Sequence, residues 1–154
     1  MYYNNQPFTG TYKQILTNGS IKINRYKNGI YHGFQTLTTS DNQLLKKRRY
    51  KNGKCFKKQL EWWPNGVKKL EFYCNKEGQK DGAYYIWYDT NTLERSLHYK
   101  NGVKDGEQVS YYNNGYVRAH YIIKKGRRFG LLGSNSCVPN KYRKPFSKNK
   151  DTSQ

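Results

Sequence analysis

Large aliphatic residues are scarce in this sequence. Leu, Ile, Val and Phe account for 28 of its 154 residues, and the formal net charge is +19. A composition this polar and this charged excludes a thick, closed core and meets a common criterion for disorder. Disordered segments are also poor in aromatic residues, whereas this chain has 16 Tyr, 6 Phe and 3 Trp that recur at regular intervals. We therefore expect most of the chain to be ordered, as one domain.

The residues that carry most enzyme chemistry are scarce as well. The chain has ten carboxylates and three histidines, His32, His98 and His120. None of these histidines stands at the spacing of a metal site or a catalytic triad. The glycines precede no helix, so they do not form a phosphate-binding loop. We predict a protein that is not an enzyme, with no metal, no cofactor and no small-molecule substrate.

Cysteines and long apolar runs are the remaining absences. Cys55, Cys74 and Cys137 are odd in number and have no CxxC spacing, which favours reduced thiols over a disulfide framework or a zinc site. The sequence shows no leader pattern at its N-terminus and no run of about 18 apolar residues. The predicted location is the cytoplasm.

What the sequence has instead is a repeat. The string Tyr-Lys-Asn-Gly occurs at Tyr26–Gly29, Tyr50–Gly53 and Tyr99–Gly102, and degenerate copies end at Gly78 and Gly126. A second glycine follows each copy four residues later, except where Lys57 replaces it. A further turn signal lies between the copies, at Asn18-Gly19, Asp41-Asn42, Asn65-Gly66, Thr90-Asn91 and Asn114-Gly115. Each unit therefore predicts a strand, a tight turn at this signal, a second strand and a looser turn.

The predicted fold is all-β: an elongated, twisted antiparallel β-meander of about five tandem β-hairpin repeats, each roughly 24 residues long. The repeat domain covers residues 8–130. Residues 131–140, where the repeat marks stop, are predicted to be a C-terminal cap. Residues 141–154 are predicted to be a basic, disordered tail.

Treating the Asn-Gly pairs as two-residue loops assigns each side chain to one face of the sheet. The predicted buried face collects Leu16, Ile21, Ile23, Leu37, Leu44, Trp63, Leu70, Phe72, Ile86, Tyr88, Leu93, Leu97, Tyr112, Val117, Ala119 and Tyr121. The opposite face mixes Ile15, Phe34, Leu60 and Val109 with aromatic and basic residues. Its candidate partner-binding residues are Trp62, Tyr85, Trp87, Tyr111, Lys69 and Arg118. The alternative interpretation is that these aromatic residues form cross-strand ladders that only stabilise the sheet.

Basic residues occur in clusters, chiefly Lys46, Lys47, Arg48 and Arg49, and Lys124, Lys125, Arg127 and Arg128. Adjacent residues of a strand point to opposite faces, so Lys46 and Arg48 are expected to separate from Lys47 and Arg49. One interpretation is a solvated surface that keeps the protein soluble. The other is a surface for an anionic partner, such as nucleic acid, an acidic protein or an anionic membrane.

The strings YKNG, WWPNG and YYNNG, with their KDG turns, resemble those of MORN-repeat-variant proteins, the group that includes YwqK-like antitoxin components of bacteria. The resemblance spans about residues 8–130. It implies an elongated sheet that contacts proteins or membranes, a role in neutralising a co-encoded toxin, and no catalytic residue. Repeat 2 departs from the pattern at Asp41-Asn42 and Lys57. We predict a non-catalytic protein-interaction scaffold of this type, with electrostatic binding of nucleic acid or an anionic membrane as the alternative.

Overall fold

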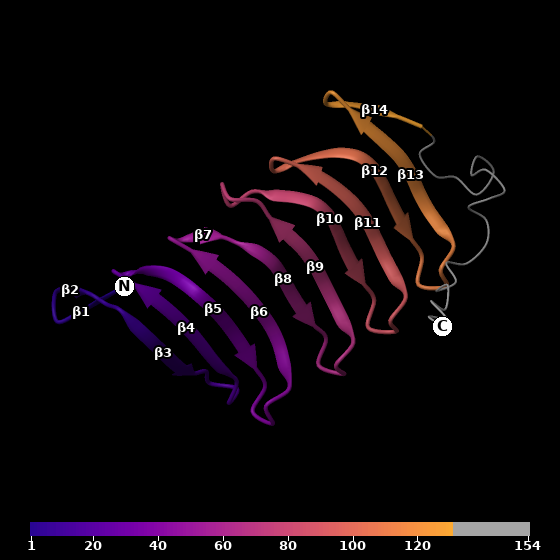
Figure 1. Ribbon diagram of the computed structural model, residues 1–154. Helices are drawn as coiled ribbons and strands as arrows, with labels where there is room; N and C mark the ends of the chain where they lie inside the picture. Colours follow the sequence, from indigo (N-terminus) through magenta and orange to yellow (C-terminus); the bar gives the residue numbers. More distant parts are fainter. Residues whose placement is uncertain (131–154) are drawn as a thin grey trace, which may run out of the picture.

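The protein is described by a computed structural model over residues 1–130. A small hairpin of β1 (Tyr2–Tyr3) and β2 (Gln6–Pro7) precedes one large antiparallel sheet. That sheet contains β3 (Gly10–Ile15), β4 (Ile21–Lys27), β5 (Ile30–Thr38), β6 (Leu44–Lys51), β7 (Lys54–Cys55), β8 (Lys57–Trp62), β9 (Lys68–Cys74), β10 (Lys80–Trp87), β11 (Leu93–Lys100), β12 (Val103–Tyr111), β13 (Val117–Lys124) and β14 (Arg127–Phe129). The strands lie side by side in chain order, and the short β7 pairs with β6 (Figure 1). The predicted all-β meander is confirmed; the predicted cap and tail lie outside the described residues.

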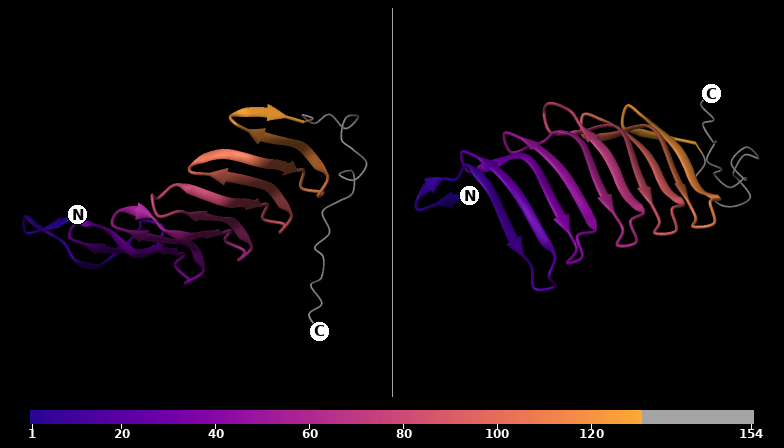
Figure 2. Two further views of the ribbon diagram at one scale, coloured as in Figure 1. Left: turned by 45° about the horizontal axis from the view of Figure 1, so that its top comes forward. Right: turned by 60° about the horizontal axis from the view of Figure 1, so that its bottom comes forward.

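The large sheet is a single layer that bows and twists along its length (Figure 2). Over residues 1–130, no helix or second layer covers either face. Within this part of the chain, the buried apolar residues are Leu70, Phe72, Cys74, Leu93, Leu97, Val109 and Val117. A sheet this thin needs few aliphatic residues, which accounts for the polar composition.

The Tyr-Lys-Asn-Gly strings form the tightest turns. Asn28 and Gly29 both have positive φ, 51° and 78°, and Lys27 pairs directly with Ile30 across the two-residue loop. Positive φ at both central residues is the signature of a type I′ hairpin turn, and Asn-Gly is its preferred sequence. The looser turn was expected at these strings, so the two kinds of turn are exchanged relative to the prediction.

The other Asn-Gly pairs belong to loops of three residues. The Leu16 amide donates to the Ser20 carbonyl, and the Gly19 amide donates to the Leu16 carbonyl. Because this loop is one residue longer than predicted, Ile15 pairs with Ile21. A shift of one residue moves a whole strand to the other face. The predicted placement of Ile21 and Ile23 with Leu37 is therefore wrong.

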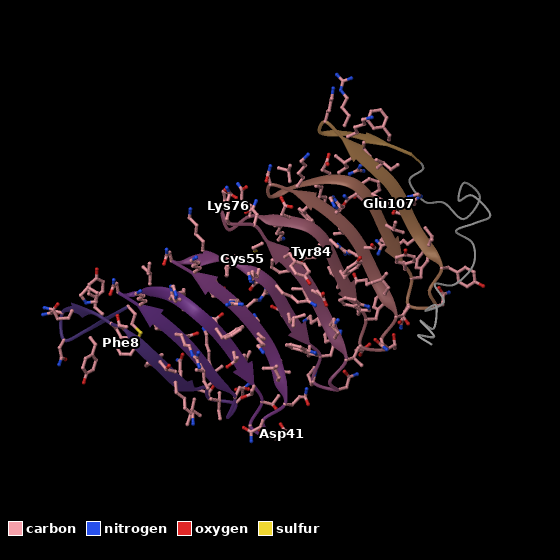
Figure 3. All side chains as sticks on the ribbon, viewed as in Figure 1. Phe8, Asp41, Cys55, Lys76, Tyr84 and Glu107 are labelled. Atoms are coloured by element: carbon pink, nitrogen blue, oxygen red, sulfur yellow. A yellow bond between two sulfur atoms is a disulfide. The ribbon has the colours of Figure 1, made fainter. Side chains whose placement is uncertain are left out.

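In the next turns of this kind, a β-bulge offsets the longer loop. Trp62 pairs with Lys68 and Glu61 pairs with Leu70, so Lys69 is the extra residue. The body of β9 thus recovers the predicted register, and Leu70 packs with Phe72 as expected. Equivalent register shifts occur in the hairpins β5–β6, β10–β11 and β12–β13. Asp41 and Lys76 mark turns at the two opposite ends of the strands (Figure 3).

Two faces result, and both bury side chains. We call the face with Tyr26, Tyr50, Phe72, Tyr84 and Leu97 the tyrosine face, since cross-strand partners in the sheet share a face. We call the other the tryptophan face; it carries Trp62, Tyr85, Trp87, Val109 and Tyr111.

The prediction of one buried face is therefore wrong. Val117 packs against Val109 and Tyr111 on the tryptophan face, whereas Ala119 pairs with Ser110 on the other side. The bulge separates Val117 from Ala119 because its extra residue, Arg118, interrupts the alternation of the strand.

The second set of glycines lies at bends within the strands. Gly33, Gly82 and Gly106 have φ of 91°, 85° and 80°, and Lys57 occupies the equivalent position with φ of 57°. Two residues after this bend, Gln59 is fully buried and its side chain bonds to the backbone of Arg49. A side chain thus completes the backbone hydrogen bonding where the bend interrupts it.

Cys55 and Cys74 form a disulfide, with Cα atoms 5.8 Å apart. The prediction of reduced thiols is therefore wrong for this pair. The two residues are 19 positions apart with no motif, and pairing of β7 and β8 with their neighbours brings them together. Cys137 lies outside the described residues.

Candidate interaction surfaces

The structure places four of the six predicted partner-binding residues together. Trp62, Tyr85, Trp87 and Tyr111 all lie on the tryptophan face and are all half-buried. The rings of Tyr85 and Trp87 have centroids 5.6 Å apart. The ammonium group of Lys68 lies 5.1 Å from the Trp87 ring. An aromatic surface edged by a cation thus runs across β8, β10 and β12.

The other two predicted residues, Lys69 and Arg118, do not join this surface. Each is the extra residue of a bulge. The Lys69 ammonium lies 4.1 Å from the centroid of the Trp63 ring. Arg118 lines a hollow with Leu97 and Tyr121, which belong to the tyrosine face. Their predicted place beside Trp62 is wrong, because the bulges reverse the alternation there.

The aromatic surface is held by bonds between neighbouring repeats. The Trp63 indole N–H donates to the Trp87 carbonyl over 2.9 Å. The Tyr88 hydroxyl donates to the Tyr111 carbonyl over 3.0 Å. These residues were expected only to fill the core, and the repeat period of about 24 residues was the signal that could have paired them.

Aromatic ladders are the dominant feature of the tyrosine face. Ring centroids are 4.8 Å apart for Tyr26 and Tyr31, and 5.3 Å apart for Tyr31 and Tyr50. A second ladder joins Phe72 to Tyr84 at 5.1 Å, and Figure 3 shows Tyr84 near the middle of the sheet. Stacked pairs of this kind contribute about 0.5–1.5 kcal/mol each. The ladders of this face therefore stabilise the sheet, a role that was considered for the aromatic residues of the other face.

The cluster at residues 46–49 divides between the faces, as predicted. Lys46 and Arg48 both contact the Glu61 carboxylate on the tyrosine face. Lys47 and Arg49 instead lie near the ring of Phe34 on the tryptophan face, with the charged groups 5.0 and 5.3 Å from its centroid.

The second cluster surrounds the turn between β13 and β14. Lys124 pairs with Arg127 across the turn, and Lys125 lies within it with φ of 50°. The Arg128 guanidinium lies 4.4 Å from the Tyr121 ring. The two predicted basic clusters are therefore separate surfaces and not one stripe.

Two carboxylates neutralise part of the positive charge. Burial acts to raise the pKa of Glu61, but hydrogen bonds and charges from Arg48 and Lys46 outweigh burial and lower it. Burial likewise acts to raise the pKa of Glu71, but hydrogen bonds and charges from Lys58 and Lys68 outweigh burial and lower it. Each of these carboxylates thus stays ionised at neutral pH between two cations.

A hollow of about 340 Å³ opens on the tryptophan face, beside the aromatic surface. Its lining is formed by Phe34, Lys47, Arg49, Lys57, Lys58, Leu60 and Tyr73. Phe34 and Leu60 were predicted on this face, but nothing in the linear pattern brought Lys57, Lys58 and Tyr73 to them. Pairing of β6 with β8, and of β8 with β9, makes these residues neighbours.

The described residues contain no group of three or more His, Cys, Asp or Glu side chains that could hold a metal ion. His120 Nε2 lies 2.8 Å from the Glu107 carboxylate, a pair that linear spacing had not suggested. The residues sit 13 positions apart on the adjacent strands β12 and β13. His120 pairs with Val109, so this pair lies on the tryptophan face. A histidine and a carboxylate also need a nucleophile or a substrate site to form a catalytic group.

Comparison with known proteins assigns the sequence to no family. The sequence matches no protein-family model, and no curated protein is significantly similar to it. Within residues 1–130, no helix has the length and apolar character needed to cross a bilayer.

Proposed function

We propose that this protein is a non-catalytic interaction scaffold of the MORN-repeat-variant type, which binds a protein partner on its tryptophan face. The single layer of the sheet is the observation that carries the proposal. In the part of the chain that the structure describes, it leaves Trp62 and Trp87 without a covering layer. Aromatic side chains held on rigid strands are typical anchors of protein interfaces.

The resemblance to YwqK-like proteins makes an antitoxin component the most specific form of this proposal, with a co-encoded toxin as the partner. A net charge of +19 favours a partner with an acidic surface, because complementary charge speeds association and disfavours other partners. We propose no substrate, cofactor or metal for this role.

The cellular location has two competing indications. The sequence favours the cytoplasm, whereas the Cys55–Cys74 disulfide favours an oxidising compartment, since disulfides persist chiefly there. The two locations are distinguished by alkylating the protein directly in its own cells and counting its free thiols by mass spectrometry. An intact disulfide excludes a reducing cytoplasm.

The test is the affinity for the product of the neighbouring gene, measured by isothermal titration calorimetry with the full chain. The Trp62→Ala/Trp87→Ala variant is expected to bind at least about 30-fold more weakly, as anchors of an interface do. The control is Tyr112→Ala/Tyr116→Ala, which removes two turn residues that are each 45% exposed. Circular dichroism checks that both variants fold.

Unchanged affinity of the folded tryptophan variant would exclude this face as the binding surface. An equal loss in both variants would show that the effect is not specific to it. Absence of any binding by the parent protein would exclude the toxin as the partner.

A further inference from the structure

The hollow on the tryptophan face gathers cations that no carboxylate balances. Lys47 and Arg49 come from β6 and Lys57 from β8. Among residues 1–130, no carboxylate lies within 4.0 Å of these three cations. Glu71, on the same face, is already bound to Lys58 and Lys68 at 2.7 Å each. Like charges held this close repel one another, and an anionic ligand relieves that repulsion.

Aromatic rings hold these cations in place. The Arg49 guanidinium lies between two rings, 5.3 Å from the centroid of Phe34 and 5.4 Å from that of Phe56. The Lys57 ammonium lies 5.5 Å from the Phe56 ring. Cation–π contacts of this kind restrict the side chains, so less ordering is needed when a ligand binds.

The floor of the hollow is apolar and partly open. Phe34 is 37% exposed and Tyr73 is 43% exposed, with Leu60 between their strands. A ligand that fits must therefore present a flat, uncharged surface to these rings and an anionic group to the cations. Its size is limited by the volume of about 340 Å³, at the small end of ligand sites.

We propose that this hollow binds a nucleotide unit of a single-stranded nucleic acid. The base stacks on the exposed rings of Phe34 and Tyr73, and the adjoining phosphates contact Lys47, Arg49 and Lys57. Aromatic platforms among basic residues are the usual means of binding single strands without reading their sequence. This site is independent of the protein-binding proposal, because it uses none of the residues tested there.

Other anionic partners fit the hollow less well. The bases of a duplex are stacked inside the helix, so a duplex offers phosphates and no free ring face. A peptide of acidic residues alone supplies carboxylates but no flat ring beside them. An anionic bilayer presents its phosphates as a plane, whereas the apolar floor here is recessed among the cations.

The test is fluorescence anisotropy with a labelled oligothymidylate of about ten nucleotides, a length within the usual range for single-strand sites. The full chain is titrated at several salt concentrations. The hollow variant is Lys47→Gln/Arg49→Gln, and the matched control is Lys46→Gln/Arg48→Gln. Both change the same strand by two charges, but the control residues contact Glu61 on the other face. Should this control unfold, Lys22→Gln/Lys46→Gln replaces it: Lys22 shares the face of Lys46 through Leu37, and Arg48 stays on Glu61.

The parent is expected to bind the single strand more tightly than a duplex of equal length. The hollow variant should lower the log–log salt slope by roughly 0.7 for each phosphate that its side chains no longer neutralise, and the control should not. Phe34→Ala should weaken binding about 5- to 150-fold with little change in that slope, because stacking involves no counterion release.

Three results would overturn the proposal. Equal binding of duplex and single strand would indicate general electrostatic attraction. An equal loss in the control variant would place the binding outside the hollow. Binding of oligoglutamate, or of vesicles containing anionic phospholipid, by a protein that does not bind the oligonucleotide would assign the hollow to those partners.

Discussion

Two buried glutamines provide a matched pair for testing how the sheet is held at its bends. Gln59 and Gln108 occupy equivalent positions, two residues after Lys57 and Gly106, and both have no exposed surface. We consider replacing each by leucine, which nearly keeps the volume and removes the amide. The two substitutions look alike in the sequence, but the hydrogen bonds they remove differ.

The Gln59 amide is saturated. Its Oε1 accepts from the Arg49 amide at 3.1 Å, and its Nε2 hydrogens are shared among the carbonyls of Arg49, Phe56 and Lys57 at 3.0 to 3.2 Å. At about 1 kcal/mol per bond, with an added cost for a backbone group left unpaired, Gln59→Leu should cost about 3–4 kcal/mol.

The Gln108 amide is only half used. Its Nε2 donates to the His98 carbonyl at 2.9 Å and to that of Gly106 at 3.4 Å, while its buried Oε1 has no hydrogen-bond partner within residues 1–130. Gln108→Leu removes one good bond but also removes the unpaired oxygen, so the cost should be about 1 kcal/mol or less. The expected difference between the variants is about 3 kcal/mol.

Urea unfolding followed by tryptophan fluorescence measures this difference, and hydrogen exchange of the Arg49 amide measures it locally. In Gln59→Leu that amide should lose protection, whereas in Gln108→Leu it should not. If Gln108→Leu proves as destabilised as Gln59→Leu, burial alone explains both costs and the hydrogen bonds of Gln59 do not hold the bend.

Four further substitutions have defined outcomes. Lys57→Gly should stabilise the protein by roughly 0.5–1 kcal/mol in urea unfolding, since φ of 57° is costly for lysine and not for glycine, although glycine has more freedom when unfolded. Gly82→Ala, where no atom lies within 4 Å of the added Cβ, should cost about 1 kcal/mol from the backbone alone. Loss of the disulfide in Cys55→Ser should lower stability by about 3 kcal/mol for a loop closed over a separation of 19, and a reducing agent should lower the Tm of the parent but not of this variant. The pKa of Glu61 is lower in the folded state than its usual value of 4.5. The stability from its ion pairs is therefore fully present above pH 4.5 and is lost as the pH falls through the folded pKa. Glu61→Gln should flatten this acid dependence of stability in thermal unfolding, and an unchanged slope would contradict the role of Glu61.

The candidate surfaces could be predicted only in part. Trp62, Tyr85, Trp87 and Tyr111 share a face because alternation along a strand is a local rule. Lys69 and Arg118 were misplaced since a bulge adds one residue to one strand only, and nothing in the linear pattern marks it. The hollow was missed because its residues come from two hairpins, β5–β6 and β8–β9, and their proximity depends on the pairing of β6 with β8.

The repeat, the hairpins and the all-β fold can all be predicted from the amino-acid sequence. These follow from local chemistry: Asn and Gly adopt the positive φ that tight turns need, and polar and apolar residues alternate with the pleat. The lengths of the Asn-Gly loops, the bulges that offset them, and the pairing of Cys55 with Cys74 emerge only when the strands assemble. Each depends on the register between strands far apart in the chain, and a shift of one residue in that register exchanges the two faces of the sheet.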